Sequence, residues 1–180
     1  MFVKKANRSL RFCINFRKLN TITQKDRYPL PLINKILARI SKAAIFTKLD
    51  IYQAFYRIRI DTESEELTIF RTWYSSYKYK VLPFGLTNRP ATYQRYINDV
   101  LFDYLDVFCT VYLDDILIYS ENKLEYQEHV TKILQRLREA GLQVDLDKYE
   151  FHVKRTKYLG FIISTDSIKV DPDKVSVVKE

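Results

Sequence analysis

Two adjacent carboxylates, Asp114 and Asp115, lie between two short apolar segments, 107–112 and 116–119. Two carboxylates at one strand tip repel each other unless a cation lies between them. Mg²⁺ takes oxygen ligands, is commonly held by one or two carboxylates together with substrate phosphates, and serves phosphoryl transfer in pairs. The pair therefore indicates metal-assisted chemistry on a phosphate, although an Asp-Asp pair in a hairpin is more often ordinary turn chemistry.

A third carboxylate would complete such a site, and Asp50 is suitably placed at the end of the apolar segment 44–49. Asp26 is the only other acid among the first sixty residues. A lone Asp that ends a strand is usually a turn residue or a helix cap. Asp50 is thus a candidate only in combination with the Asp114 pair.

Hydrophobic periodicity predicts the elements that must position these residues. The two apolar segments around the Asp pair are typical of a β-hairpin with acids at its tip. Helices are expected over 32–40 after Pro29 and Pro31, from Thr87 or Asn88 with Pro90 in the first turn, around Val130–Leu137 before Gly141, and again from Asp171-Pro172. Strands are expected at 10–16, 44–50, 55–60, 67–73, 77–82, 142–146 and 158–163, after a basic hairpin arm at 3–5.

Composition excludes several classes of protein. The chain has 180 residues, 47% of them hydrophobic, which is enough for one sizeable core, and only three Gly and five Pro argue against collagen-like or low-complexity sequence. Cys13 and Cys109 are far apart, so a disulfide framework is not expected. With 29% charged residues and no long apolar run, we expect an intracellular protein without a membrane partner, in an unknown compartment.

The positive charge is concentrated near the N-terminus. Residues 1–60 hold 14 Lys and Arg against two acids, whereas 61–120 hold five against nine and 121–180 hold eleven of each. Basic residues alternate there with aromatic and aliphatic ones, which favours a folded surface that faces phosphates. A solvated basic face without a ligand is the simpler alternative.

Several ordered motifs resemble the reverse transcriptases of gypsy-type LTR retrotransposons. Tyr112-Leu113-Asp114-Asp115 and Leu49-Asp50-Ile51 are similar to their catalytic motifs, and the resemblance covers essentially the whole chain. The further matching blocks are RFCINFRKLN at 11–20, DRYPLP at 26–31, LPFGLTN at 82–88, PATYQ at 90–94 and YLGFIIS at 158–164.

The resemblance implies an α+β fold made of polymerase fingers and palm, in which an antiparallel sheet with the catalytic β-hairpin packs on helices. It implies one fingers-palm domain over 1–170, fingers-like at about 1–48 and 62–90 and otherwise palm. Relative to the family, we expect a chain truncated before Met1 and cut off within the thumb, of which 171–180 would be the start.

The resemblance also implies RNA-directed DNA synthesis in a retrotransposon polyprotein, whose other segments would be further partners. The substrates would be a primed RNA or DNA template and deoxynucleoside triphosphates, and the cofactors two Mg²⁺ ions, with Mn²⁺ as a possible substitute. The implied catalytic residues are Asp50, Asp114 and Asp115, with Ile51 joining them at the metals. Nucleotide contacts would come from Lys5, Arg11, Phe55, Phe84, Gly85 and Lys148, and template or primer contacts from Arg17, Asn20, Pro90, Gln94, Tyr112, Tyr158, Leu159 and Gly160.

Some positions depart from the family pattern. Arg89 occupies a position that is normally small, and Tyr52 and Gln53 differ beside the nucleotide pocket, so added bulk is expected to obstruct nucleotide or template. The alternatives are a catalytically inactive, nucleic-acid-binding remnant, an RNA-templated RNA polymerase and a purely structural domain. The ring of Phe55 argues against the RNA polymerase because it would clash with a ribose 2'-hydroxyl, although Phe55 is also compatible with an ordinary core aromatic.

Overall fold

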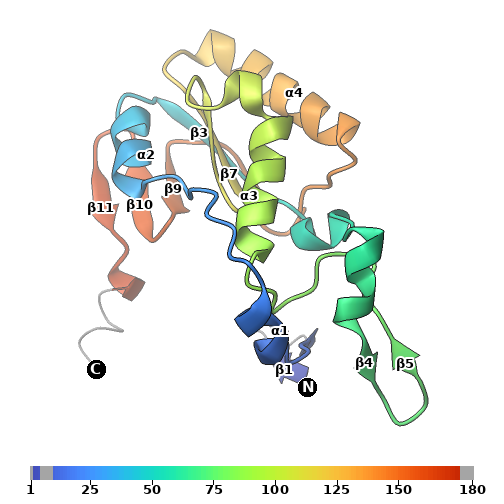
Figure 1. Ribbon diagram of the computed structural model, residues 1–180. Coiled ribbons are helices and arrows are strands. Elements are labelled where there is room, and N and C mark those ends of the chain that lie inside the picture. Colours follow the sequence, from blue (N-terminus) through green and yellow to red (C-terminus); the bar gives the residue numbers. More distant parts are fainter. Residues whose placement is uncertain (1, 5–9, 175–180) are drawn as a thin grey trace. The chain divides into compact units, whose positions relative to one another are not determined.

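The computed structural model describes residues 2–4 and 10–174, which form two compact units (Figure 1). Unit 1 comprises Met1–Tyr28 and Gln53–Arg95, and unit 2 comprises Pro29–Tyr52 and Tyr96–Glu180. The fold is α+β with antiparallel sheets, as expected. The fingers-like and palm ranges stay a prediction.

Unit 2 is built on a four-stranded antiparallel sheet in the order β6-β7-β3-β8. The strands are short and mostly apolar, and they include both segments of the expected hairpin. Their bounds are β3 Ile45–Asp50, β6 Cys109–Tyr112, β7 Asp115–Ser120 and β8 Glu150–Val153.

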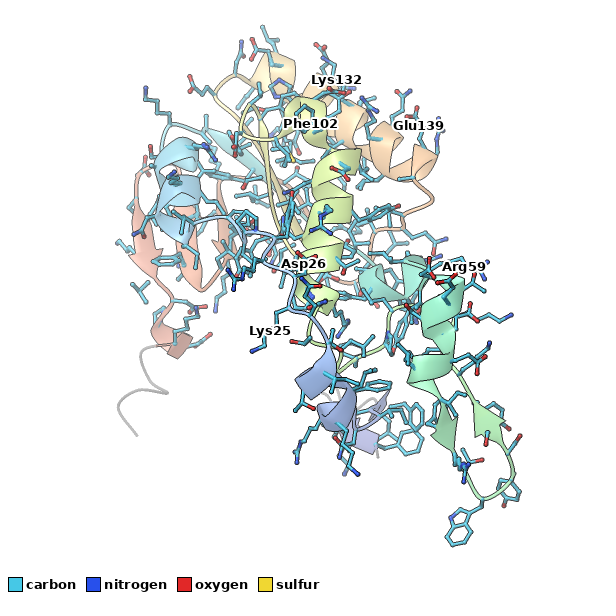
Figure 2. All side chains as sticks on the ribbon, viewed as in Figure 1. Lys25, Asp26, Arg59, Phe102, Lys132 and Glu139 are labelled. Atoms are coloured by element: carbon cyan, nitrogen blue, oxygen red, sulfur yellow. The ribbon has the colours of Figure 1, made fainter. Side chains whose placement is uncertain are left out.

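Both faces of this sheet are covered, which is why β3 and β7 are buried along nearly their whole length. Phe46 faces a buried cluster that includes residues of α2 (Ile33–Ile40). Its neighbour Thr47 points to the other face, where its hydroxyl lies 2.5 Å from the hydroxyl of Tyr126 on α4 (Lys123–Glu139). Figure 2 shows Lys132 and Glu139 on α4 pointing outward, as expected for an amphipathic helix.

A second, three-stranded sheet in unit 2 has the order β11-β10-β9. Its strands are β9 Arg155–Tyr158, β10 Phe161–Ser164 and β11 Ile168–Val170. The strand expected at 158–163 is therefore wrong in its bounds, because Leu159 and Gly160 both have positive φ and turn the chain between β9 and β10. Asp171-Pro172 begins a turn of helix as expected, and residues 175–180 lie outside the described part of the chain.

Unit 1 consists of short elements. Its described residues form two hairpins, three short helices and the first turns of α3 (Arg89–Val100), which ends in unit 2. The hairpins are β1 Phe2–Lys4 with β2 Leu10–Phe12, and β4 Phe70–Arg71 with β5 Ser76–Tyr77. The short helices are α1 Arg17–Ile22 and the 3-10 helices η1 Ala54–Arg57 and η2 Thr62–Thr68.

Several expected strands are wrong. Residues 55–60 form η1 and an extended segment with one bridge at Arg59, and 142–146 contribute only the bridge from Val144 to Ile51. The strands expected at 10–16 and 67–73 shrink to β2 and β4. The strand expected at 77–82 keeps only Tyr77 in β5 and the bridge of Val81 with Arg59. In the described part of the chain, no helix has both the length and the apolar character needed to cross a membrane.

Candidate active site

The fold of unit 2 brings the three candidate carboxylates to one end of the sheet. Asp50, the last residue of β3, is the register partner of Asp115, the first residue of β7. Asp114 precedes Asp115 in the hairpin turn, and its carbonyl oxygen accepts a hydrogen bond from the amide of Ile51 at 3.1 Å. Residues far apart in the sequence therefore meet at the strand ends.

The hairpin turn holds Asp114 in a constrained position. Leu113, the first of its two central residues, has a φ of +54°, in the left-handed region. Two-residue hairpins favour such a φ because it matches the twist of the strands, but a residue with a side chain loses about 1–2 kcal/mol there. The paired strands on both sides offset that loss, so the turn is fixed by the sheet.

The pKa values of Asp50 and Asp115 are both raised above the ordinary value. Burial is the largest cause for each. The negative charge of Asp114 raises both pKa values further, and Asp50 also raises that of Asp115. The carboxylates therefore repel one another across the strand ends, which is the electrostatic situation that a cation relieves.

Two lysines partly relieve this repulsion. The Nζ of Lys148 donates to Oδ1 of Asp50 at 3.0 Å and lies 3.4 Å from Oδ2 of Asp145. The Nζ of Lys48 lies 3.5 Å from Oδ1 of Asp115. Burial alone would lower the pKa of Lys148, but its contacts with Asp50 and Asp145 outweigh burial and raise it.

Sequence reasoning missed Lys48 and Asp145. Lys48 lies two residues before Asp50 on the same strand, so the period of two already places both side chains on one face. Asp145 had no such signal. Its amide donates to the carbonyl of Asp50 at 2.8 Å, a contact between segments almost a hundred residues apart.

The chemistry of the donors fits a hard divalent cation. Asp50, Asp114 and Asp115 offer only oxygen atoms, and Ile51 could add only its backbone carbonyl. In the described residues, however, no three His, Cys, Asp or Glu side chains are gathered closely enough to form a metal cluster. Reverse transcriptases in general use divalent metals. Here the lysine ammonium groups neutralise the charge that such a metal would otherwise neutralise.

A cleft of about 400 Å³ opens beside Asp115 within unit 2. Its lining includes Lys48 and the expected template or primer residues Tyr112, Tyr158, Leu159 and Gly160. The structure therefore brings these four residues together beside Asp115. Tyr158 is almost fully buried, and its hydroxyl donates to the carbonyl of Asp115 at 3.4 Å, so this side chain supports the hairpin.

Two of the expected nucleotide residues meet in unit 1. The guanidinium carbon of Arg89 lies 3.6 Å from the ring centroid of Phe55 and 3.5 Å from that of Phe84. Phe55 also packs on Tyr93, with ring centroids 4.8 Å apart. Arg89 is buried between the two rings, so its bulk, which we expected to obstruct nucleotide or template, is folded into a cation–π stack.

The loop that contains Gly85 is tied to α1. Asn20 donates to the carbonyl of Gly85 at 2.7 Å and accepts from the amide of Thr87 at 2.9 Å. Gly85 has a φ of +100°, and a Cβ there would lie 3.3 Å from the carbonyl oxygen of Ile14. A side chain at position 85 would therefore strain this junction.

The remaining expected site residues are dispersed over unit 1. Arg17 is exposed on α1, Pro90 is exposed in the first turn of α3, and Gln94 is fully buried in α3. Arg11 lies in β2, and Lys5 lies outside the described residues. Their contacts with nucleotide or template stay predictions.

The raised pKa values of Asp50 and Asp115 predict a pH dependence of stability. Between the ordinary value of 3.8 and the raised value, the folded state binds more protons than the unfolded state, so stability falls as the pH rises through this window. We therefore expect Asp115→Asn to be at least as stable as the parent at neutral pH. The difference should vanish near pH 3.8, and urea unfolding at both pH values measures it. A variant that is less stable at neutral pH would show that the Lys48 ion pair outweighs burial and repulsion.

Comparison with known proteins supports a single family. A family model described as "Reverse transcriptase (RNA-dependent DNA polymerase)" matches residues 3–163. The chain is 42% identical over 168 residues to the Retrovirus-related Pol polyprotein from transposon 297, and 40% identical over 175 residues to that from transposon gypsy, both of Drosophila melanogaster. These matches cover 93% and 97% of the chain but only 16% and 17% of the relatives, so the chain spans about a sixth of their length.

Solved structures show the same fold. The foamy viral protease-reverse transcriptase in complex with an RNA/DNA hybrid matches 99% of the chain with a TM-score of 0.86 and 22% identity, over 24% of its own length. The form in complex with double-stranded DNA matches 99% of the chain with a TM-score of 0.90 and 22% identity, over 31% of its own length.

Proposed function

The chain belongs to the reverse transcriptase (RNA-dependent DNA polymerase) family, and we propose that it adds deoxynucleotides to the 3'-hydroxyl of a primer on an RNA or DNA template. The observation that carries this proposal is the register pairing of Asp50 with Asp115 beside Asp114. Three carboxylates at one strand end, with a cleft next to Asp115, suit metal-assisted phosphoryl transfer.

Asp50, Asp114 and Asp115, with the carbonyl of Ile51, would hold two Mg²⁺ ions, or Mn²⁺ in their place. Bound divalent ions would lower the pKa of the primer hydroxyl and neutralise charge on the phosphates. Asp50 and Asp115 would bind the ions through the carboxylate oxygens that now contact Lys148 and Lys48. The two ammonium groups would then be available to contact the substrate. Lys148, within 3.0 Å of Asp50, would then be placed to contact the triphosphate.

Nucleic acid as the partner is supported by charge and by the relatives. Residues 1–60 carry 14 Lys and Arg against two acids, which suits contacts with phosphates. The foamy viral enzymes named above are in complex with an RNA/DNA hybrid and with double-stranded DNA. We propose that Phe55, Phe84 and Gly85 of unit 1 contribute to nucleotide binding, as the resemblance implies.

Primer extension on an RNA template tests the proposal. The chain of 180 residues is compared with an Asp114→Asn, Asp115→Asn double variant, using deoxynucleotides and Mg²⁺ or Mn²⁺. We expect extension by the parent alone, because Asn is similar in size but lacks the charge that binds a cation. The double variant should keep salt-dependent binding of primer-template, measured by anisotropy of a labelled primer at two salt concentrations.

Three results would contradict the proposal. Equal extension by both proteins would show that the Asp pair does not carry the reaction. If neither protein extends while both bind primer-template, the alternative of a catalytically inactive nucleic-acid-binding remnant replaces it. If ribonucleotides are used as readily as deoxynucleotides, the RNA polymerase alternative is favoured, and Phe55→Val then tests whether that ring selects the sugar.

A further inference from the structure

The tip of the β4–β5 hairpin in unit 1 exposes aromatic side chains. Trp73 is 100% exposed, Tyr74 95% and Tyr77 51%. Every residue from 71 to 78 is exposed, and the two strands form a projecting hairpin in Figure 1. A group of exposed aromatic side chains, unlike a single one, is typical of a surface that binds a partner or a ligand.

The backbone of this tip is ordered by Thr72. The hydroxyl oxygen of Thr72 accepts from the amides of Tyr74 at 3.2 Å and Ser75 at 3.1 Å, and the amide of Thr72 donates to the carbonyl of Ser75 at 2.8 Å. At the base, the ring of Phe70 stacks on that of Tyr77. The exposed rings are thus presented by a fixed turn, which limits the entropy lost when they bind a ligand.

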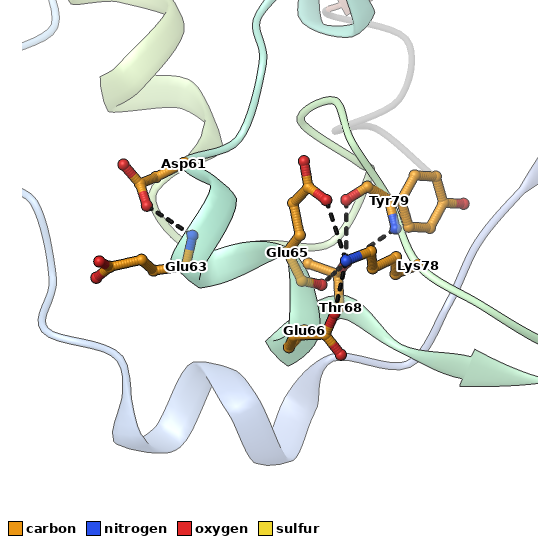
Figure 3. A network of polar contacts seen from close by, with 7 residues as sticks. All are labelled: Asp61, Glu63, Glu65, Glu66, Thr68, Lys78 and Tyr79. Carbon is orange, nitrogen blue, oxygen red and sulfur yellow. Dashed lines mark hydrogen bonds and ion pairs between the residues drawn. The ribbon is translucent and has the colours of Figure 1, made fainter.

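The charge around the tip is positive. No Asp or Glu occurs from Leu67 to Asn98, whereas Arg71, Lys78 and Lys80 follow one another along the hairpin. Lys78 is paired with acids of η2, which offset its charge: Figure 3 shows the Nζ of Lys78 between Glu65 and Glu66, at 3.3 Å and 2.5 Å. The exposed Arg71 and Lys80 therefore supply the positive charge that attracts an anion toward the aromatic faces of the tip.

We infer that the β4–β5 tip, residues 71–77, is a stacking site for unpaired bases of a single-stranded nucleic acid. Single-strand-binding surfaces combine positive charge, which follows the backbone, with aromatic rings on which bases stack. The inference rests on the proposed function in that a polymerase handles a single-stranded template, but it assigns a site that the chemistry at Asp50 does not need. An anionic membrane surface is the competing occupant.

The single tryptophan of the chain makes this site directly observable. Trp73 fluorescence is titrated with an oligothymidylate and with an abasic oligomer of the same length and charge. We expect marked quenching by oligothymidylate and little by the abasic oligomer, because quenching reports stacking and not phosphate contact. Anisotropy of a labelled oligothymidylate should show binding about 5- to 100-fold weaker for Trp73→Ala, and close to the parent for Trp73→Phe.

Phe102→Ala is the matched control, since Phe102 is an exposed aromatic of unit 2, next to Asp103. It should leave binding unchanged. Equal quenching by the two oligomers, unchanged binding by Trp73→Ala, or a shift of Trp73 emission only with anionic phospholipid vesicles would overturn the inference. The two proposals can fail separately. If the parent shows quenching by oligothymidylate but no primer extension, the stacking site stands and the proposed function falls. If the parent extends primers but shows no quenching, the stacking site falls and the proposed function stands.

Discussion

Replacing Asp50 with Asn should slow primer extension by about a thousandfold or more while the protein stays folded. Metal ions contribute several kcal/mol to phosphoryl transfer, and about 4 kcal/mol corresponds to three powers of ten in rate. Asn keeps the size of the side chain, and its carbonyl oxygen can still accept from Lys148, which now donates to Asp50 at 3.0 Å. Single-turnover extension and a Mg²⁺-dependent shift of the unfolding midpoint measure the two effects separately.

Asp145→Asn provides the matched control for this prediction. Asp145 contacts the same amine, at 3.4 Å from the Nζ of Lys148, but it is not one of the three proposed metal-binding carboxylates. We expect it to slow extension by less than about tenfold and to keep the Mg²⁺-dependent shift. An equal loss in both variants would mean that the charge balance around Lys148, and not metal binding by Asp50, governs the reaction.

Local sequence patterns were sufficient to predict the strands that carry the carboxylates. The expected strands 44–50, 107–112 and 116–119 are confirmed as β3, β6 and β7, with bounds shifted by one or two residues. Apolar, β-branched segments on both sides of a polar pair allow little other than a hairpin buried on both faces. The acids at the tip were therefore predictable from the residues alone.

The pairing of Asp50 with Asp115 was not predictable in this way. The two residues are separated by 64 others, and their register depends on how β3 fits between β7 and β8. Only the resemblance to reverse transcriptases grouped them. Lys48 and Asp145 complete the charges at this end of the sheet, but only Lys48 carried a local signal, because Asp145 reaches Asp50 through a contact between distant segments.

The strand expected at 55–60 shows how a local pattern misleads. Polar and apolar residues alternate there, which is the signature of a half-buried strand. Gln53, however, adopts a φ of +51°, and its carbonyl accepts from the amide of Tyr56, so the chain enters a 3-10 turn. Helix α1 also carried little local signal: its N-cap residue makes no side-chain cap, none of its residues is buried, and Asn20 joins it to the distant loop at Gly85.

The second large effect is expected at Phe46, in the strand that ends at Asp50. Phe46 is fully buried, and its register partners are Tyr119 on β7 and Val153 on β8. Phe46→Ala removes a ring from the middle of this cluster and should lower the free energy of unfolding by about 3–5 kcal/mol, as buried Phe-to-Ala changes do. Urea unfolding followed by circular dichroism measures this loss.

This substitution also tests whether the site depends on the core of unit 2. Phe102→Ala, the same change at a side chain that is 76% exposed, should alter the unfolding free energy by no more than about 0.5 kcal/mol. Folded domains are typically stable by about 5–15 kcal/mol, so the expected loss is a large part of the total. The Phe46 variant should therefore unfold at temperatures where the parent is still active, and its primer extension should fall in proportion to the folded fraction. A loss of unfolding free energy below about 1 kcal/mol would mean that hydrogen bonds to β7 and β8, and not the packing of Phe46, hold β3 in place. Asp50 would then keep its position opposite Asp115 without the Phe46 ring.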